Sequence, residues 1–353
     1  TTRNEGVAIM VATTETLVSL KPLSDEECWR VFCECAGVES DALAGSEREK
    51  IGRELVRRCD GVVLGAALLG GALVNTHNLE RWKDLARGNS DREKDVMLVM
   101  MHSYNDLPWE LKRCFSVFAM FPEYFHFIDD EIVKIWVAEG IVKWEETSDY
   151  GKDHRYYEEF KRRSLLFEEK YGVRMHDMVR EMVCKIEGKS CCTGNNLANG
   201  FDSNVTRRLY VNGGESPLDF IRGPTVLRTM VIQDSYVKQE DLSDLFLKLK
   251  YLRALLLKMC YSISEFPESI GKLAHLRFLR IFYLEIRLLP QSIGDLHNLE
   301  ILELHCCGKL LKLPSSLGNL KNLKSLILVQ CDKMEYIPDS IGDLSNLENL
   351  EIS

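Results

Sequence analysis

The segment Pro290-Gln-Ser-Ile-Gly-Asp-Leu296 decides the fold, because it is one copy of a segment that recurs in phase toward the end of the chain. Related copies begin at Pro267, Pro314 and Pro338, so successive copies are 23, 24 and 24 residues apart. A fixed period of this length is typical of architectures in which one short structural unit stacks on the next.

Each copy is followed by four aliphatic residues at constant offsets. In the second copy they are Leu296, Leu299, Leu302 and Leu304, and the other copies keep the same spacing. A unit with one strand and one turn cannot bury this apolar edge alone, whereas stacking buries it as a continuous column. The pattern predicts leucine-rich repeats over residues 206–353, incomplete at the C-terminal end.

The strand residues that alternate with the leucines are expected on the concave face of the repeats. This face would mix apolar and charged side chains, which suits a protein partner. The candidate partner-binding residues are Leu256, Arg280, Phe282, Tyr283, Glu303, His305, Ile327 and Val329. The partner could be a foreign protein or another domain of the same chain, and the sequence leaves both open.

The N-terminal half predicts helices. Ser24-Asp-Glu-Glu27 is a capping box, which favours a helix that continues through Trp29 and Phe32. The apolar run from Val62 to Val74 is too short to cross a bilayer and indicates a buried helix. Ile132, Ile135 and Trp136 have helical spacing and precede Gly140.

A hairpin is expected between Leu166 and Met175, and a last helix follows it, with Asp177 as the expected N-cap. Helices with one hairpin resemble a winged-helix unit, which raises DNA binding as an alternative. The basic run Lys161–Arg163 lies beside two glutamates, and the chain carries a net charge of −9. We therefore expect no nucleic-acid partner.

Composition bounds the class of protein. Hydrophobic residues make up 45% of the 353 residues, which excludes a disordered chain. Twelve scattered cysteines without a secretory leader indicate reduced thiols and a cytoplasmic location, and no segment is expected to cross a membrane. The chain begins at Thr1 and stops within a repeat, so we expect it to be part of a longer protein.

Several motifs together resemble the central and C-terminal parts of plant nucleotide-binding (NB-ARC) leucine-rich-repeat immune receptors of the coiled-coil class. Leu20 to Trp29 resembles the start of the first ARC subdomain, and Cys114 to Pro122, followed by Ile135 to Gly140, resembles the second. Met175-His176-Asp177 resembles the MHD motif of this family, and Thr1-Thr2-Arg3 resembles the end of its nucleotide-binding subdomain.

The resemblance implies a multidomain fold, an α part followed by an α/β solenoid. Residues 1–22 would be the remnant of a nucleotide-binding subdomain, 23–93 a helical first ARC subdomain and 94–190 a winged-helix-like second ARC subdomain. A linker over 191–205 would lead to the horseshoe of repeats, which is expected to contact the ARC subdomains.

The resemblance also implies a molecular switch. ADP would hold a closed state, and exchange for ATP would open the receptor for oligomerisation and defence signalling after it recognises a pathogen effector or a guarded host protein. His176 would donate to the diphosphate and Arg3 would sense the γ-phosphate. Met175, Asp177, Gly61, Val63 and Leu64 complete the candidate nucleotide-binding residues.

Two departures from the family pattern weaken nucleotide binding. Gly61-Val-Val-Leu-Gly-Ala66 stands where the family has Gly-Leu-Pro-Leu-Ala, so Val63 replaces the proline that packs on adenine. The chain also contains no phosphate-binding loop of the G-x-x-x-x-G-K-[ST] type. We therefore expect weak or no ADP binding by this chain alone, and no enzymatic activity. The alternative function is a nucleotide-free adaptor or decoy that binds protein partners through its repeats.

Overall fold

The computed structural model describes residues 22–59, 61–74, 78–87, 96–123, 125–127, 129–144, 155–170, 172–193, 200–213 and 218–353. The chain forms two compact units, Thr1–Asp106 with Arg162–Ser164, and Leu107–Lys161 with Leu165–Ser353. Arg3, one of the candidate nucleotide-binding residues, lies outside the described residues.

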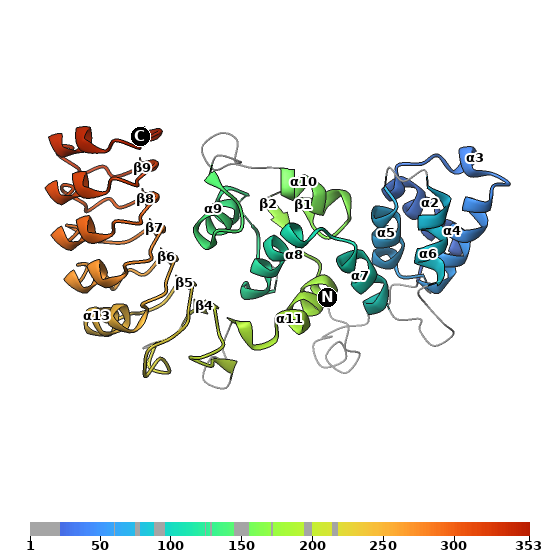
Figure 1. Ribbon diagram of the computed structural model, residues 1–353, viewed down its shortest axis with the longest axis horizontal. Helices are drawn as coiled ribbons and strands as arrows, with labels where there is room; N and C mark the ends of the chain where they lie inside the picture. Colours follow the sequence, from blue (N-terminus) through green and yellow to red (C-terminus); the bar gives the residue numbers. More distant parts are fainter. Residues whose placement is uncertain are drawn as a thin grey trace, which may run out of the picture. The chain divides into compact units, whose positions relative to one another are not determined.

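The first unit is a helical bundle, as the sequence predicts (Figure 1). Its helices are α2 (Asp25–Ala36), α3 (Ser40–Leu43), α4 (Glu47–Arg58), α5 (Val63–Ala72), α6 (Leu79–Arg87) and α7 (Val96–Asn105). The capping box is confirmed, because the Ser24 side chain accepts the N–H of Glu27 while the Glu27 carboxylate accepts the N–H of Ser24 at 2.8 Å. The unit ends at Asp106 instead of residue 93, since α7 packs against α5.

Aromatic rings and small residues set the packing of this bundle. Phe32 on α2 lies between Trp29 and Trp82, with ring centroids 5.3 Å and 5.7 Å away. A Cβ atom on Gly70 would lie 2.3 Å from the Phe32 carbonyl oxygen. Glycine at this position therefore lets α5 approach the backbone of α2 closely.

The second unit begins with a winged-helix domain. Its elements are α8 (Trp109–Ser116), η1 (Val117–Met120), α9 (Asp129–Glu139), α10 (Arg155–Arg162), β1 (Phe167–Glu169), β2 (Gly172–Arg174) and α11 (Asp177–Glu187). Phe118 is the centre of its core and makes edge-to-face contacts with Phe127, Trp136 and Phe160. The expected hairpin is confirmed as the antiparallel pair β1 and β2, and Phe127 bridges to Val173 beside it.

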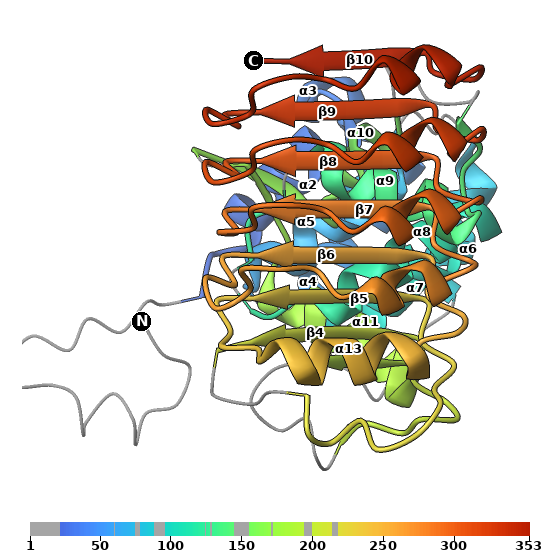
Figure 2. The same cartoon turned by 90° about the vertical axis from the view of Figure 1, so that its left-hand side faces the viewer.

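The repeats form a parallel sheet of eight strands in the order β10-β9-β8-β7-β6-β5-β4-β3. The strands are β3 (Cys191–Thr193), β4 (Arg208–Asn212), β5 (Thr229–Gln233), β6 (Ala254–Lys258), β7 (Phe278–Phe282), β8 (Ile301–His305), β9 (Ser325–Val329) and β10 (Asn349–Ile352). Figure 2 shows β4 to β10 stacked in register. The linker expected over 191–205 is wrong for Cys191–Thr193, because these residues pair with β4 as a strand of the sheet.

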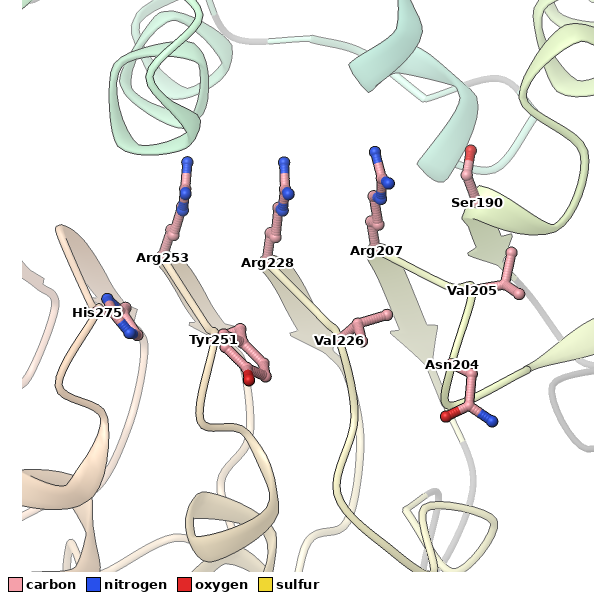
Figure 3. A pocket seen from close by; sticks show the side chains of 9 residues that line it. All are labelled: Ser190, Asn204, Val205, Arg207, Val226, Arg228, Tyr251, Arg253 and His275. Atoms are coloured by element: carbon pink, nitrogen blue, oxygen red, sulfur yellow. The ribbon is translucent and has the colours of Figure 1, made fainter.

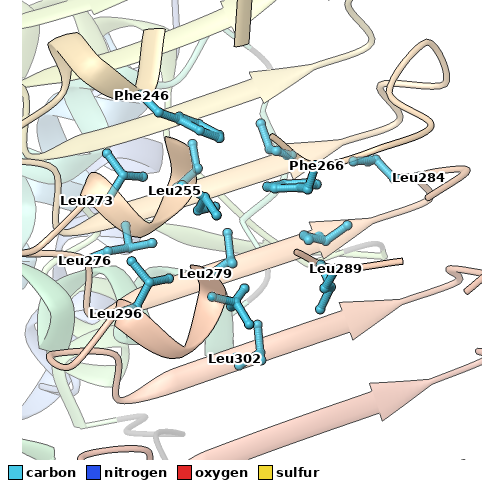
Figure 4. Close-up of a cluster of buried hydrophobic side chains, with 14 of the residues drawn as sticks. Phe246, Leu255, Phe266, Leu273, Leu276, Leu279, Leu284, Leu289, Leu296 and Leu302 are labelled. Atoms are coloured by element: carbon cyan, nitrogen blue, oxygen red, sulfur yellow. The ribbon is translucent and has the colours of Figure 1, made fainter. Parts of the chain in front are cut away.

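One face of the sheet is covered by a helix and four 3-10 turns. These are α13 (Gln239–Lys248), η4 (Glu268–Lys272), η5 (Gln291–Asp295), η6 (Ser315–Asn319) and η7 (Asp339–Asp343). Leucines from strands and turns meet between these layers in a fully buried column (Figure 4). The recurring glycine has a steric cause. A Cβ atom on Gly294 would lie 2.5 Å from the carbonyl oxygen of Ser316 in the next repeat, so only glycine allows the turns to stack this closely.

Candidate functional site

Helix α9 of the winged-helix domain packs on the concave face of the repeats, against β6 and β7. Every residue from Glu131 to Glu139 is buried, although three of them carry charge: Glu131, Lys134 and Glu139. Buried charges are stable only when they are paired and hydrogen-bonded. The structure shows the partners on the strands of the sheet.

Glu303 on β8 is the centre of this charged interface. Its side chain has no exposed surface and accepts hydrogen bonds from Lys134 on α9 and from Arg280 on β7. Arg280 also donates to Asp130 at 3.0 Å and to Glu131 at 2.9 Å. Lys258 on β6 donates to both carboxylate oxygens of Glu131, at 2.6 Å and 2.5 Å. The side chains of the concave face thus form ion pairs with one helix, α9.

The surrounding cations keep Glu303 and Asp130 ionised. Burial by itself would raise the pKa of Glu303, but the neighbouring Arg280 and Lys134 outweigh burial and hold this pKa well below its usual value. The pKa of Asp130 is lowered by the same two cations against the same effect of burial. Glu303 and Asp130 are therefore ionised at neutral pH.

A second group of contacts holds the C-terminal end of α9. Arg208 on β4 donates to the two carboxylate oxygens of Glu139 at 2.8 Å and 2.6 Å, and the Thr229 hydroxyl donates to Glu139 at 2.6 Å. Arg253 donates to the backbone carbonyl of Glu139 at 2.7 Å. Cations at a helix C-terminus complement its partial negative charge, so this end of α9 fits the arginine-rich beginnings of the strands.

Most candidate partner-binding residues lie on the strands, in rows that alternate with the buried leucines. Leu256, Arg280, Glu303 and Ile327 are consecutive partners in the register and are buried. Phe282, His305 and Val329 form the adjacent row and are half-buried. Tyr283 is different, because it lies one residue beyond β7 with φ of 55° and leaves 46% of its surface exposed.

Of the two partners that the sequence left open, the structure shows contact within the chain. Arg280 and Glu303, predicted as partner-binding residues, bind charged residues of α9. Sequence analysis missed the α9 side of the contact. The missed residues are Asp130, Glu131, Lys134 and Glu139. Charged side chains spread over a helix that is otherwise apolar were a signal that α9 is buried against a charged surface.

The candidate residues of the MHD motif lie at the start of α11. Met175 is buried, and His176 is half-buried and is the N-cap of the helix, with Nδ1 accepting the N–H of Met178 at 3.2 Å. The expectation that Asp177 is the N-cap is wrong, since Asp177 is already the first helical residue and His176 has the extended backbone of a cap. Because Nδ1 accepts, the neutral ring of His176 carries its proton on Nε2.

The other candidate nucleotide-binding residues belong to the helical unit. Gly61 has φ of 78°, and its carbonyl accepts the N–H of Leu23 at 3.0 Å. Val63 is the first residue of α5 and has 46% of its surface exposed, while Leu64 is half-buried. The N-cap residue Val62 makes no side-chain hydrogen bond to the helix.

Two regions of the chain match known protein families. Residues 120–183 match the winged helix domain of disease resistance proteins, and residues 227–353 match a leucine-rich repeat region. Among the described residues, no helix combines the length and the apolar character needed to cross a membrane. The expected architecture, a winged-helix domain followed by leucine-rich repeats, is confirmed.

Relatives in Arabidopsis thaliana cover most of the chain. Disease resistance RPP8-like protein 3 is 30% identical over 86% of this chain and 36% of its own length. Disease susceptibility protein LOV1 is 31% identical over 80% of this chain and 35% of its own length. Disease resistance protein RPP8 is 30% identical over 86% of this chain and 37% of its own length. This chain therefore spans little more than a third of these relatives.

A solved leucine-rich repeat protein of Leptospira interrogans is 30% identical over 35% of this chain and 31% of its own, with a TM-score of 0.31. This superposition is too poor to carry an argument, and the two family matches and the Arabidopsis relatives decide the assignment. The chain belongs to the plant disease resistance proteins that join a winged helix domain to leucine-rich repeats.

Proposed function

We propose that the chain is the regulatory and sensing part of an intracellular plant immune receptor in the cytoplasm. In this proposal, ADP favours a closed state, and exchange for ATP after recognition of an effector or guarded host protein favours an open state that oligomerises. The observation that carries the proposal is the placement of α9 on the concave face of the repeats, because a partner that uses this face would have to displace α9.

The chemistry of the contact suits an interface that opens. An ion pair in the interior gains Coulomb energy but loses hydration, so its net contribution is small compared with that of a packed apolar contact. When the interface opens, the charged groups of Glu131, Glu303 and Arg280 regain water, which offsets part of the loss of their ion pairs. A ligand that binds one state better can then shift the population between two states of similar free energy.

Two features of the chain fit a nucleotide. The Nε2 hydrogen of His176 is a donor of the kind that a diphosphate accepts, and it stands at the start of α11. Val62 and Val63 expose apolar surface at the uncapped N-terminus of α5, which suits contact with a base. In the proposed switch, His176 links the identity of the nucleotide to the winged-helix domain. The chain itself lacks a phosphate-binding loop, so we propose no hydrolysis by it.

The test measures nucleotide content in the full-length protein. We would denature the purified protein and quantify the ADP and ATP that it releases, for the wild type and for His176→Ser. Serine retains an N-cap oxygen for α11 but removes the ring donor, so the expected result is a loss of most bound ADP in a protein that still folds. His126→Ser, which alters a surface histidine of the same domain, is the matched control and should retain ADP.

Unchanged ADP content in His176→Ser would exclude the proposed role of the histidine. Absence of nucleotide from the wild type itself would reject the switch. That result would favour the alternative function, a nucleotide-free adaptor or decoy that binds proteins through its repeats.

A further inference from the structure

Four arginines form a ladder at the N-terminal ends of the strands. The four residues Arg207, Arg228, Arg253 and Arg277 precede β4, β5, β6 and β7. The backbone N–H of each of the last three donates to the carbonyl of the arginine before it, at 2.7 to 2.8 Å. Neighbouring strands of a sheet are about 4.8 Å apart, so the side chains form a row of positive charge with this spacing. Figure 3 shows Arg207, Arg228 and Arg253 extended side by side in the same direction.

The ladder borders a groove of about 660 Å³. The groove is lined by Ser190, Asn204, Val205, Arg207, Val226, Arg228, Tyr251, Arg253 and His275. Three of these residues are arginines, and none is acidic. A concave site with one sign of charge concentrates ligands of the opposite charge.

The arginines of the ladder differ in what they already bind. Arg253 and Arg277 donate to backbone carbonyls at the end of α9, and Arg277 also pairs with Glu300. The side chains of Arg207 and Arg228 make no ion pair or hydrogen bond with any described residue. Glu139, the nearest acidic group of α9, is already held by Arg208.

This arrangement is unfavourable without an anion. Burial lowers the pKa of Arg228, and repulsion from the adjacent Arg253 and Arg207 lowers it further, against the opposite effect of Glu139. Like charges placed side by side destabilise a fold unless something neutralises them. A guanidinium group can donate two parallel hydrogen bonds to the oxygens of one phosphate. A row of guanidinium groups can therefore bind a row of linked phosphates.

From this geometry we propose that the groove binds a small molecule with several linked phosphates, with Arg207 and Arg228 as its main contacts and Arg253 at its edge. This site is separate from the nucleotide contact proposed for His176, Gly61 and Val63. Tyr251 and His275 stack at the rim with ring centroids 6.1 Å apart and planes 12° apart. Their rings offer a face for a nucleoside base, so the source is either a nucleoside triphosphate or inorganic polyphosphate.

The experiment is calorimetric titration of the chain with tripolyphosphate at low ionic strength. The wild type should bind tripolyphosphate at least tenfold more tightly than inorganic phosphate. The double variant Arg207→Gln with Arg228→Gln should lose this binding by tenfold or more. Arg287→Gln, an exposed arginine of the same repeats outside the groove, should bind as the wild type does.

Thermal unfolding separates ligand binding from a structural role. Without ligand, the double variant should unfold at the wild-type temperature or above it, because it relieves repulsion and breaks no ion pair. With tripolyphosphate, only the wild type and Arg287→Gln should be stabilised. Equal affinity for phosphate and tripolyphosphate, equal binding by the double variant, or a lower unfolding temperature of that variant without ligand would overturn the proposal.

A titration with ATP distinguishes a nucleoside triphosphate from inorganic polyphosphate as the ligand. Tighter binding of ATP than of tripolyphosphate, with the gain removed by Tyr251→Ala, supports a nucleoside triphosphate, and equal affinity supports inorganic polyphosphate. His176→Ser should leave tripolyphosphate binding unchanged. The groove and the proposed nucleotide switch can therefore fail independently of each other.

Discussion

Glu303 is a buried carboxylate that depends on cations from two distant segments. Removing it with Glu303→Ala leaves Lys134 and Arg280 buried with fewer anionic partners. Truncating one member of a buried ion pair costs about 3 to 5 kcal/mol, because the remaining charge loses its compensation. We expect a loss near the lower end of this range, since Asp130 and Glu131 remain. Urea unfolding followed by circular dichroism measures the free energy of unfolding.

A matched control lies on the surface of the same repeats. Glu285 pairs with Lys309 at 2.8 Å, and both side chains are about half exposed. Surface pairs contribute about 0 to 1 kcal/mol, so Glu285→Ala should change stability little. Similar losses in Glu303→Ala and Glu285→Ala would contradict the buried network.

At the residue scale, the sequence could predict the start of α11 only to within one residue. His176 and Asp177 both have side chains that accept backbone N–H groups, and either can precede an apolar helix. The extended backbone of His176 places the cap there, and this depends on how the hairpin ahead of it packs. Local sequence does not contain that information.

At the scale of the repeat, the glycine of the recurring segment gives a clean comparison. Gly294→Ala would place a Cβ atom 2.5 Å from the Ser316 carbonyl oxygen, whereas a Cβ atom on Gly308, in the turn after β8, would have no atom within 4 Å. Overpacking costs about 1 to 3 kcal/mol, so Gly294→Ala should destabilise the repeats by this amount. Gly308→Ala should be neutral or slightly stabilising, because alanine restricts the unfolded chain.

Thermal unfolding of the two alanine variants measures this difference. A Gly294→Ala protein as stable as Gly308→Ala would show that the turns can separate without loss of stability. That result would contradict a role for glycine in the close stacking of η5 on η6.

The elements that repeat were the ones that sequence could predict. Four in-phase copies place each leucine of β7 to β10 and each following turn, since every copy supports the alignment of the others. Cys191–Thr193 has no leucine pattern and was assigned to a linker, although it pairs with β4. A three-residue strand is defined by its neighbour in the sheet and not by its own residues.

At the scale of the whole molecule, the family resemblance implied that the repeats contact the ARC subdomains, but the sequence did not identify the helix that makes the contact. Lys134 and Glu303 are 169 residues apart, and no local periodicity relates them. The role of the charged residues on α9 can be assigned only when their ion-pair partners on the sheet are known. Long-range pairing of this kind follows from the tertiary structure, so the α9 half of the interface was missed.

The same interface predicts how the molecule responds to acid. The pKa values of Glu303, Glu139 and Asp130 are all lowered in the folded protein, because neighbouring cations outweigh burial. A carboxylate with a lowered folded pKa contributes stability that is present above its unfolded pKa and is lost as pH falls through the folded value. The unfolded pKa values are 4.5 for glutamate and 3.8 for aspartate.

The free energy of unfolding should therefore be nearly constant from pH 7 to about 5 and should fall steadily below about pH 4.5. Hydrogen exchange should show α9 losing protection before the strands of the repeats, whose core is apolar and does not titrate. Glu139→Gln should lower stability at pH 7 and reduce the slope below pH 4.5, because one titrating carboxylate is gone. Equal loss of protection in α9 and β8, or a free energy of unfolding that does not change between pH 6 and pH 3, would show that these ion pairs do not hold the winged helix on the repeats.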